Sequence, residues 1–385
     1  MKIAVVPNAF KGSLTASQAA ACIGRGLQRA CPACEVVQIP VADGGDGTAR
    51  AVVEATCGRW ADCRARDPLG RWIESGFGLT GDGRTAVIEM ALASGLALLK
   101  PAERNPLRTG TWGTGDLIRA ALDLGVQSLL IGLGGSATND GGMGMARALG
   151  VRFLDAQGAE LEGTGADLGK VARVAAEGLD PRLGPVTVDV ACDVDNPLFG
   201  PRGAAPVYAP QKGADPATVR RLDDGLAHFA AALRRDVGVE LSGLAGGGAA
   251  GGLGAGLVAF LGARLRPGAE RVLAVAGVAE RLQGCDLVIT GEGRLDGQTV
   301  CGKAPAAVAG LARRLGLPVI AICGCLGPEV EKVREAGIGA YFSALEEPVP
   351  EEELPARGPG MLERCAEQVG RLLALGANLR ERGVS

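Results

Sequence analysis

The chain has 385 residues, which is long for one domain and comfortable for two. Its formal charge is -3, only 3% of its residues are aromatic and it has no basic block, which argues against a nucleic-acid partner. No apolar run reaches the roughly 18 residues that a membrane-spanning helix needs. The apolar core of MKIAVVP at the start is too short for a signal peptide. We therefore expect a cytoplasmic protein without a membrane segment.

The eleven cysteines and the single histidine narrow the possible chemistry. An odd number of cysteines in a chain without an export signal favours reduced thiols. Cys31 and Cys34 (CPAC) and Cys323 and Cys325 (CGC) lack a second pair at zinc spacing, so we interpret them as small buried side chains. His228 lies in a helical stretch and is not expected to be catalytic. Proton transfer then depends on carboxylate, lysine, cysteine or tyrosine side chains.

Short apolar runs alternate with helical stretches along most of the chain. Residues 2–7 predict a strand, residues 15–30 a helix and residues 35–40 a second strand. The same order of strand, helix and strand recurs over residues 286–324. Continuously apolar strands separated by helices are typical of parallel sheets that are covered on both faces.

The middle of the chain contains further apolar strands and more glycine, at residues 85–90, 128–134, 185–193 and 243–257. This change in the residue pattern predicts two domains. We expect an α/β domain built from residues 1–66 and 281–385, with a second α/β domain, residues 67–280, inserted into it. The active site is expected in the cleft between these domains.

Five loops combine glycine with charged or amide residues directly after an apolar strand. They are Pro7–Ser13, Ala42–Thr48, Ile131–Gly144, Ala191–Pro197 and Thr290–Lys303. One such loop would be an ordinary turn. Five of them favour a polyanionic ligand, because backbone N–H groups and helix N-termini bind phosphate oxygens without special side chains.

Lysine usage points the same way. The chain has seven lysines against thirty-three arginines, so arginine is its general source of positive charge. Lys11, Lys212 and Lys303 nevertheless each lie beside a glycine in a loop. A compact ammonium suits a position near phosphate where a planar guanidinium is too large. We expect at least one of the three to contact a phosphate.

Two common nucleotide motifs are present only in part. Residues 297–303 (GQTVCGK) fit a P-loop, but Ala304 replaces the Ser or Thr that binds magnesium. Residues 132–137 (GLGGSA) loosely fit a dinucleotide loop, but the loop continues through residues 139–142 where a helix should begin. An NAD-dependent hydroxy-acid oxidoreductase and a non-catalytic nucleotide sensor therefore stay as weaker alternatives.

Carboxylates are frequent in the five loops: Asp43, Asp46, Asp140, Asp193, Asp195, Glu292 and Asp296. Phosphoryl transfer uses one carboxylate to orient the attacking hydroxyl and others to hold Mg²⁺. The alternative is that each caps the helix that follows it. That alternative is open for Asp43, Asp46 and Asp296 and weaker for Asp193, which has no obvious helix to cap.

Taken together, the segments PNAFKGSLTASQAA, VADGGDGT, IGLGGSATNDGG, ACDVDNPL, PQKGA, GAAGGLGAGL and ITGEGRLDGQT closely resemble the bacterial glycerate kinase family. The resemblance implies transfer of the γ-phosphoryl group of ATP, with Mg²⁺, to D-glycerate, usually at the 2-hydroxyl; the 3-hydroxyl stays an alternative. It also implies a Rossmann-like domain interrupted by a second α/β domain. The family commonly reads PDSFKGS, whereas Asn8 and Ala9 stand here.

This resemblance, with residue type and loop position, suggests a role for each candidate. Asp193 would accept the proton of the substrate hydroxyl, and Lys11 would neutralise charge on the transferring phosphoryl group. Arg294, with Arg66 in reserve, would bind the glycerate carboxylate. The remaining candidates are Ser13 and Asp43 for the substrate, Glu292, Asp46 and Asp140 for magnesium, and Gly134, Gly135, Ser136, Thr138, Asn139, Lys212 and Lys303 for phosphate or ATP.

Overall fold

The computed structural model describes residues 1–300 and 302–381, and these residues form two compact units. Unit 1 contains Met1–Asp43, Arg50–Cys57 and Ala269–Ser385; unit 2 contains Gly44–Ala49 and Gly58–Gly268. Each unit has its own sheet and its own core. The predicted architecture, an α/β domain from both chain ends with a second α/β domain inserted, is confirmed.

The sheet of unit 1 has five strands in the order β15-β13-β11-β1-β2, and every neighbouring pair is parallel. The strands are β1 Lys2–Pro7, β2 Glu35–Gln38, β11 Leu287–Gly291, β13 Val319–Cys323 and β15 Ala340–Ser343. The helices are α1 Ala16–Ala30, α2 Thr48–Ala55, α9 Gly268–Val275, α10 Val278–Arg281, α11 Ala304–Arg314 and α12 Leu354–Glu381, and a small ladder joins β12 Arg294–Leu295 to β14 Cys325–Leu326.

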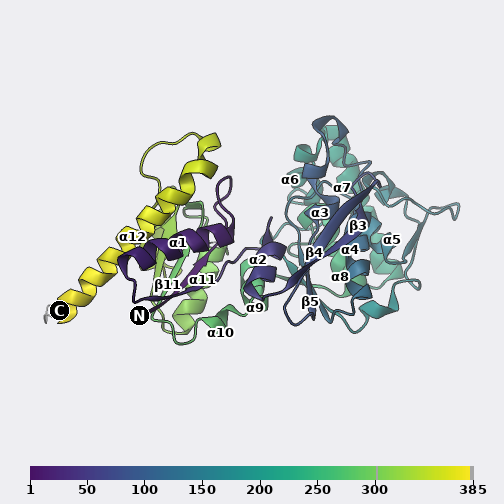
Figure 1. The fold of residues 1–385 in the computed structure, drawn as a ribbon. Coiled ribbons are helices and arrows are strands. Elements are labelled where there is room, and N and C mark those ends of the chain that lie inside the picture. Colours follow the sequence, from purple (N-terminus) through teal and green to yellow (C-terminus); the bar gives the residue numbers. More distant parts are fainter. Residues whose placement is uncertain (301, 382–385) are drawn as a thin grey trace. The chain divides into compact units, whose positions relative to one another are not determined.

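Helices cover both faces of this sheet. Side chains alternate along β1, so Ala4 and Val6 belong to one core cluster and Ile3 and Val5 to the other. The first cluster contains residues of α9, α10 and α11, and the second contains residues of α1 and α12. Figure 1 shows α1 and α12 side by side, and a Cβ added at Gly26 of α1 would lie 2.2 Å from the carbonyl oxygen of Glu363. Glycine is therefore required for this close approach of the two helices.

The strand order in unit 1 changes direction beside β1, which makes this position a topological switch point. The chain passes from β1 through α1 to β2 on one side, whereas β11, β13 and β15 follow on the other side. Open α/β sheets bind ligands outside the carboxyl ends of the strands at such a point. In unit 1 these ends carry the residues after Pro7 and after Gly291.

The sheet of unit 2 has six strands in the order β10-β9-β6-β5-β4-β3. They are β3 Arg59–Arg66, β4 Trp72–Leu79, β5 Thr85–Glu89, β6 Ser128–Gly132, β9 Thr187–Ala191 and β10 Arg264–Arg266. The first four in the sheet order are parallel to one another, while β4 and β3 are antiparallel to their neighbours. The helices are α3 Ala91–Ser94, α4 Trp112–Asp123, α5 Met143–Ala148, α6 Ala204–Tyr208, α7 Pro216–Asp236 and α8 Leu253–Leu261. A separate antiparallel pair joins β7 Arg152–Leu154 to β8 Arg173–Ala175.

The predicted domain boundaries of 66/67 and 280/281 were placed too late at both ends. The strand β3 pairs with β4 along its whole length and so belongs to unit 2. At the other end, Ala269 and Leu273 of α9 lie in the same core cluster as Ala4 of β1, so this helix belongs to unit 1. An edge strand of mixed polarity such as RWADCRAR carries no sign in its sequence of which sheet it joins.

The cysteine prediction needs one correction. Cys31 and Cys34 form a disulfide, because the turn after α1 brings their Cα atoms to 5.5 Å. The other cysteines among the described residues are free, and Cys301 lies outside those residues. Burial raises the pKa of the Cys323 thiol to about 12, which fits a small buried side chain.

Two further features bear on what the chain can do. The Nε2 atom of His228 lies 2.8 Å from the carbonyl oxygen of Val171, which gives the histidine a packing contact on α7. Among the described residues, no helix combines the length and the apolar character that crossing a membrane requires.

Candidate active site

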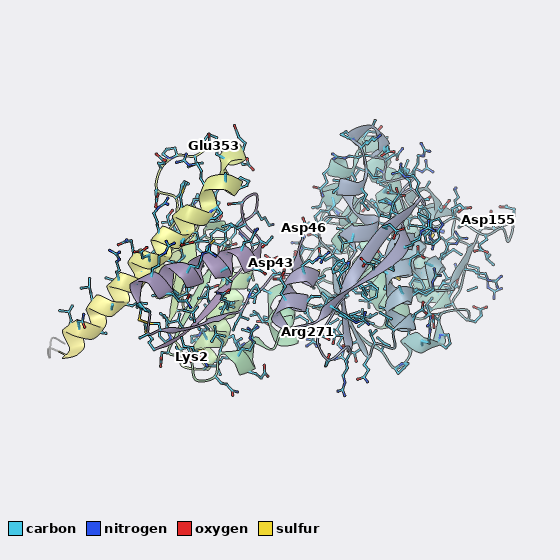
Figure 2. The ribbon with its side chains drawn as sticks, viewed as in Figure 1. Lys2, Asp43, Asp46, Asp155, Arg271 and Glu353 are labelled. Atoms are coloured by element: carbon cyan, nitrogen blue, oxygen red, sulfur yellow. A yellow bond between two sulfur atoms is a disulfide. The ribbon has the colours of Figure 1, made fainter. Side chains whose placement is uncertain are left out.

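In unit 1, the loops after β1 and β11 meet at the switch point. The Asn8 N–H donates to the Gly291 carbonyl at 2.8 Å. A Cβ added at Gly293 would lie 3.2 Å from the backbone nitrogen of Lys11. The Asn8 side-chain amide donates to the Oδ2 atom of Asp43 at 3.1 Å. Asp43 is labelled in Figure 2. The loops Pro7–Ser13 and Thr290–Lys303, predicted from the sequence, therefore lie at one edge of one sheet.

Glu292 is the most buried carboxylate of this edge, with 7% exposure. Its Oε1 atom accepts a hydrogen bond of 2.7 Å from the Thr299 hydroxyl. Burial raises the pKa of Glu292, the Thr299 hydroxyl and Lys303 oppose this, and the charges of Asp43 and Asp296 add to it. Carboxylates and a lysine thus gather within a small volume.

A magnesium ion at this edge would have few protein ligands. Among the residues that the structure describes, no three His, Cys, Asp or Glu side chains are grouped so that they could hold a metal ion. Mg²⁺ commonly takes only one or two protein carboxylates and completes its shell with water and substrate phosphates. Glu292, a buried carboxylate beside further oxygen donors, fits that mode.

The other candidates in unit 1 already have protein partners. Arg294 lies 3.3 Å from Asp296 through its Nε atom, and Lys303 lies 3.7 Å from the same carboxylate. The Ser13 hydroxyl donates to the Leu354 carbonyl at 2.9 Å, so it positions the start of α12. These contacts differ from the substrate roles that the sequence suggested for Ser13 and Arg294, but neither contact uses every polar atom of the side chain.

In unit 2, the loop after β6 contains a fully buried carboxylate, Asp140. Its Oδ2 atom accepts hydrogen bonds from the Thr111 N–H and hydroxyl and from the Gly144 N–H, and Oδ1 accepts one from the Gly142 N–H, all between 2.7 and 3.1 Å. Burial raises the pKa of Asp140, and these four donors oppose the rise. These contacts give Asp140 a structural role at the start of α5, and its assignment to magnesium stays a prediction.

Replacing Asp140 with asparagine is expected to lower the free energy of unfolding by about 3 kcal/mol, because an amide NH₂ would face buried N–H donors. Urea unfolding of the variant measures the loss. Asp224→Asn, at an exposed position on α7, is the matched control and is expected to change little. An Asp140→Asn protein as stable as the parent would contradict the structural role.

Next to this carboxylate, Lys212 is buried, with 1% exposure. Its Nζ atom donates to the Ser136 hydroxyl at 2.8 Å and to the Thr138 carbonyl at 2.7 Å. Burial lowers the pKa of Lys212 to about 7, while the Asp140 charge acts in the opposite direction. A Cβ added at Gly213, where φ is +95°, would lie 2.4 Å from the Arg104 carbonyl oxygen, so glycine is needed after this lysine.

Two polar side chains next to Lys212, those of Thr138 and Asn139, are fully buried. Within the described part of the chain, the Thr138 hydroxyl and both polar atoms of the Asn139 amide have no hydrogen-bond partner. Buried polar groups in proteins are nearly always paired, and exceptions are frequent where water or a ligand completes the site. Ser136, Thr138, Asn139 and Lys212, called the Lys212 cluster below, therefore have the character of an anion-binding site.

The pKa of Lys212 predicts how stability changes with pH. Between about pH 7 and pH 10 the unfolded state keeps the lysine proton while the folded state loses it, so the free energy of unfolding rises with pH. The slope from this group is expected to reach about 1.4 kcal/mol per pH unit. Urea unfolding of the parent and of Lys212→Met at pH 6 and pH 8.5 tests this, because the difference between them isolates the lysine. A difference that does not change with pH would refute the lowered pKa of Lys212.

The loop after β6 also packs on the segment 44–47. A Cβ added at Gly135, where φ is +73°, would lie 3.5 Å from the Oδ1 atom of Asp46, and one at Gly134 would lie 3.5 Å from the Gly45 Cα. The carboxylate of Glu89, at the end of β5, accepts hydrogen bonds from Gly47 N–H at 3.0 Å and from Ala49 N–H at 2.7 Å. Sequence analysis missed Glu89, although an acid at the end of the apolar run TAVIEM was a usable signal.

Asp193 follows β9, the neighbour of β6, so its loop lies at the same sheet edge as the loop of Ser136. The side chain is exposed, and its Oδ1 atom accepts a hydrogen bond of 2.7 Å from the Gly268 N–H. Asp195, two residues further on, lies 3.6 Å from Arg202. Asp193 is thus an anchored carboxylate that reaches solvent.

The reserve candidate Arg66 has a structural role. Its Nε and Nη2 atoms donate to the two oxygens of Asp116, each at 2.8 Å, and the Asp116 side chain is only 1% exposed. This bidentate pair occupies the edge of the guanidinium that a carboxylate ligand would use. The reserve role of Arg66 in binding glycerate stays a prediction, and it would require the guanidinium to give up this pairing with Asp116.

Fold and loops together define a two-unit α/β protein with glycine-rich polar loops at the carboxyl ends of parallel strands. Comparison with known proteins agrees. The glycerate kinase family model matches residues 3–374. The glycerate kinase of Halalkalibacterium halodurans is 49% identical over 367 residues, covering 95% of this chain and 97% of that protein. The glycerate 2-kinase of Escherichia coli K12 is 46% identical over 345 residues, covering 90% and 91%.

A solved structure extends the likeness to three dimensions. A crystal structure from Salmonella typhimurium LT2 that carries the name of a glycerate kinase 2 is 46% identical and matches with a TM-score of 0.92 over 98% of this chain and all of that one. The chain belongs to the glycerate kinase family. The prediction of an enzyme that acts as a kinase is confirmed.

Proposed function

We propose that the enzyme transfers the γ-phosphoryl group of ATP to the 2-hydroxyl of D-glycerate, giving 2-phosphoglycerate and ADP. The observation that carries this proposal is the Lys212 cluster, in which a buried ammonium lies beside polar side chains that have no partner among the described residues. A group that is dry, cationic and rich in donors favours a phosphoryl group over a neutral ligand. The name of the E. coli relative supports the 2-hydroxyl as the acceptor.

In unit 2, we assign binding of the phosphoryl oxygens to the Lys212 cluster, with the backbone N–H groups of Gly134 and Gly135 as further donors. Asp193 receives the proton from the attacking hydroxyl. The bond from the glycerate oxygen to the γ-phosphorus forms as the bond to the β,γ-bridging oxygen breaks, and that oxygen leaves with ADP.

In unit 1, Lys11 and Lys303 are assigned to neutralising charge on the phosphates. Arg294 is assigned to the glycerate carboxylate, which would compete with Asp296 for the guanidinium. Asp43 and the Ser13 hydroxyl are weaker candidates for contact with the substrate. Glu292 would hold the Mg²⁺ that accompanies ATP and supplies further positive charge. The second candidate for Mg²⁺ is Asp46, which belongs to unit 2.

The test is ³¹P NMR of the products formed from MgATP and D-glycerate. A 2-phosphoglycerate signal is the expected result. A 3-phosphoglycerate signal would leave the kinase activity in place but would mean that glycerate binds in the opposite orientation. Arg294 would then lose its assigned role. ADP without any phosphoglycerate would mean another acceptor or ATP hydrolysis. ATP binding without turnover, in protein shown to be folded, would favour a nucleotide sensor.

A further inference from the structure

A pocket of about 140 Å³ lies in unit 1, and apart from Lys11 and Ser13 its lining has no role in the reaction proposed above. It lies beside the carboxyl ends of β1, β11, β13 and β15, where Phe10, Gly293, Gly324 and Ala344 line it. The first turns of α12 complete it, including Leu354. Glu353 marks this end of α12 in Figure 2.

The lining of the pocket is almost entirely apolar. Phe10, Leu14 and Met361 are all less than 9% exposed. The Ser13 hydroxyl, which also lines the pocket, already donates to the Leu354 carbonyl. Of the described residues that line the pocket, Lys11 alone carries a charge. Such a wall does not suit glycerate or a phosphate, because either would lose hydration without gaining partners.

Size and position favour a flat aromatic group. A cavity of about 150 Å³ with apolar walls is large enough to hold a benzene ring. The pocket adjoins the switch point of the parallel sheet, where open α/β folds bind nucleotides. Lys11, a cation on the same lining, can meet the phosphates that a nucleotide carries next to its base.

We propose that this pocket binds the adenine base of the ATP, with the phosphates leaving it past Lys11. The proposal rests on the proposed function in one respect, that ATP is the phosphoryl donor. Adenine would bury its ring against Phe10, Leu14 and Met361, and this burial of apolar surface would supply affinity for the base.

Equilibrium binding of ADP and of inorganic tripolyphosphate, measured by calorimetry without glycerate, tests this directly. Val349 lines the pocket, so Val349→Trp is expected to fill it and to weaken ADP binding by about tenfold or more. Tripolyphosphate, which has no base, is expected to bind Val349→Trp as well as it binds the parent. Leu315→Trp, at an exposed apolar position in the same unit, is the matched control and should leave both affinities unchanged.

A second measurement needs no substitution. Cys325 lines the pocket, whereas Cys57 is exposed elsewhere. ADP is expected to slow alkylation of Cys325 by N-ethylmaleimide while Cys57 reacts at its usual rate, and tripolyphosphate should slow neither. Peptide mass spectrometry follows both sites in one sample.

The outcomes separate this inference from the proposed function. Unchanged ADP affinity in folded Val349→Trp, or protection of Cys325 by tripolyphosphate alone, would overturn the pocket while leaving kinase activity intact. A third outcome is that Val349→Trp loses ADP affinity and ADP protects Cys325 in the parent, but the parent does not phosphorylate glycerate. That outcome would support the adenine pocket and reject glycerate as the acceptor. Failure of the parent protein to bind ADP at all would overturn both.

Discussion

Replacing Lys212 with methionine is expected to reduce kcat/KM for glycerate phosphorylation by about 10²–10³-fold, the usual effect of removing one charge-stabilising donor from a dry site. The ammonium is buried and already donates to the Ser136 hydroxyl and the Thr138 carbonyl. Methionine has similar length and keeps the packing, but it has no charge. Steady-state kinetics with MgATP and D-glycerate measure the loss.

Stability separates a catalytic role for Lys212 from a structural one. A buried charge is costly, and an apolar residue of similar volume is often neutral or stabilising in its place. We therefore expect Lys212→Met to lose activity while its free energy of unfolding at pH 6 stays level or rises. Lys100→Met, at an exposed lysine in the same unit, is the matched control. A folded Lys212→Met enzyme with kcat/KM close to that of the parent would remove Lys212 from the reaction, and a parallel fall in stability and activity would indicate a structural role.

The second large effect is expected at Asp193. Asp193→Asn should lower kcat by about 10²–10⁴-fold, because the substitution removes the group that accepts the hydroxyl proton. The local fold should not change, since the amide oxygen can still accept the hydrogen bond from the Gly268 N–H. ADP affinity is therefore expected to stay at the value of the parent.

Asp195→Asn is the natural control for this substitution. It makes the same chemical change two residues away, at a side chain whose partner is Arg202. Kinetics and calorimetry on both variants complete the test. Turnover of Asp193→Asn equal to that of Asp195→Asn would rule out Asp193 as the base.

The sequence was sufficient to predict which loops lie at the carboxyl edges of the two parallel strand groups. The apolar runs of β1, β6, β9 and β11 mark buried parallel strands, and the residues that follow such strands meet at one edge of a sheet. Ser136, Lys11 and Glu292 were found in this way.

Side-chain direction and long-range pairing could not be predicted by the same means. Asp140 and Asp193 have the same chemistry and both follow a strand, but one lies within four hydrogen bonds and the other is exposed. Arg66 is occupied by Asp116, and Asn139 is buried by packing from several segments. These properties depend on residues that are close in space and distant in sequence, which residue type does not reveal.

The position of β1 between β2 and β11 also has a consequence for protein synthesis. The strand β1 is made well before its neighbour β11, which begins at Leu287. Residues 58–268 of unit 2 are contiguous, so nearly all of that unit leaves the ribosome before β11 exists. Until then Val5 and Val6 lie on a strand with one open edge, a state prone to pairing with other chains. The pairing of β1 must therefore remain incomplete until most of the residues between β1 and β11 have been made.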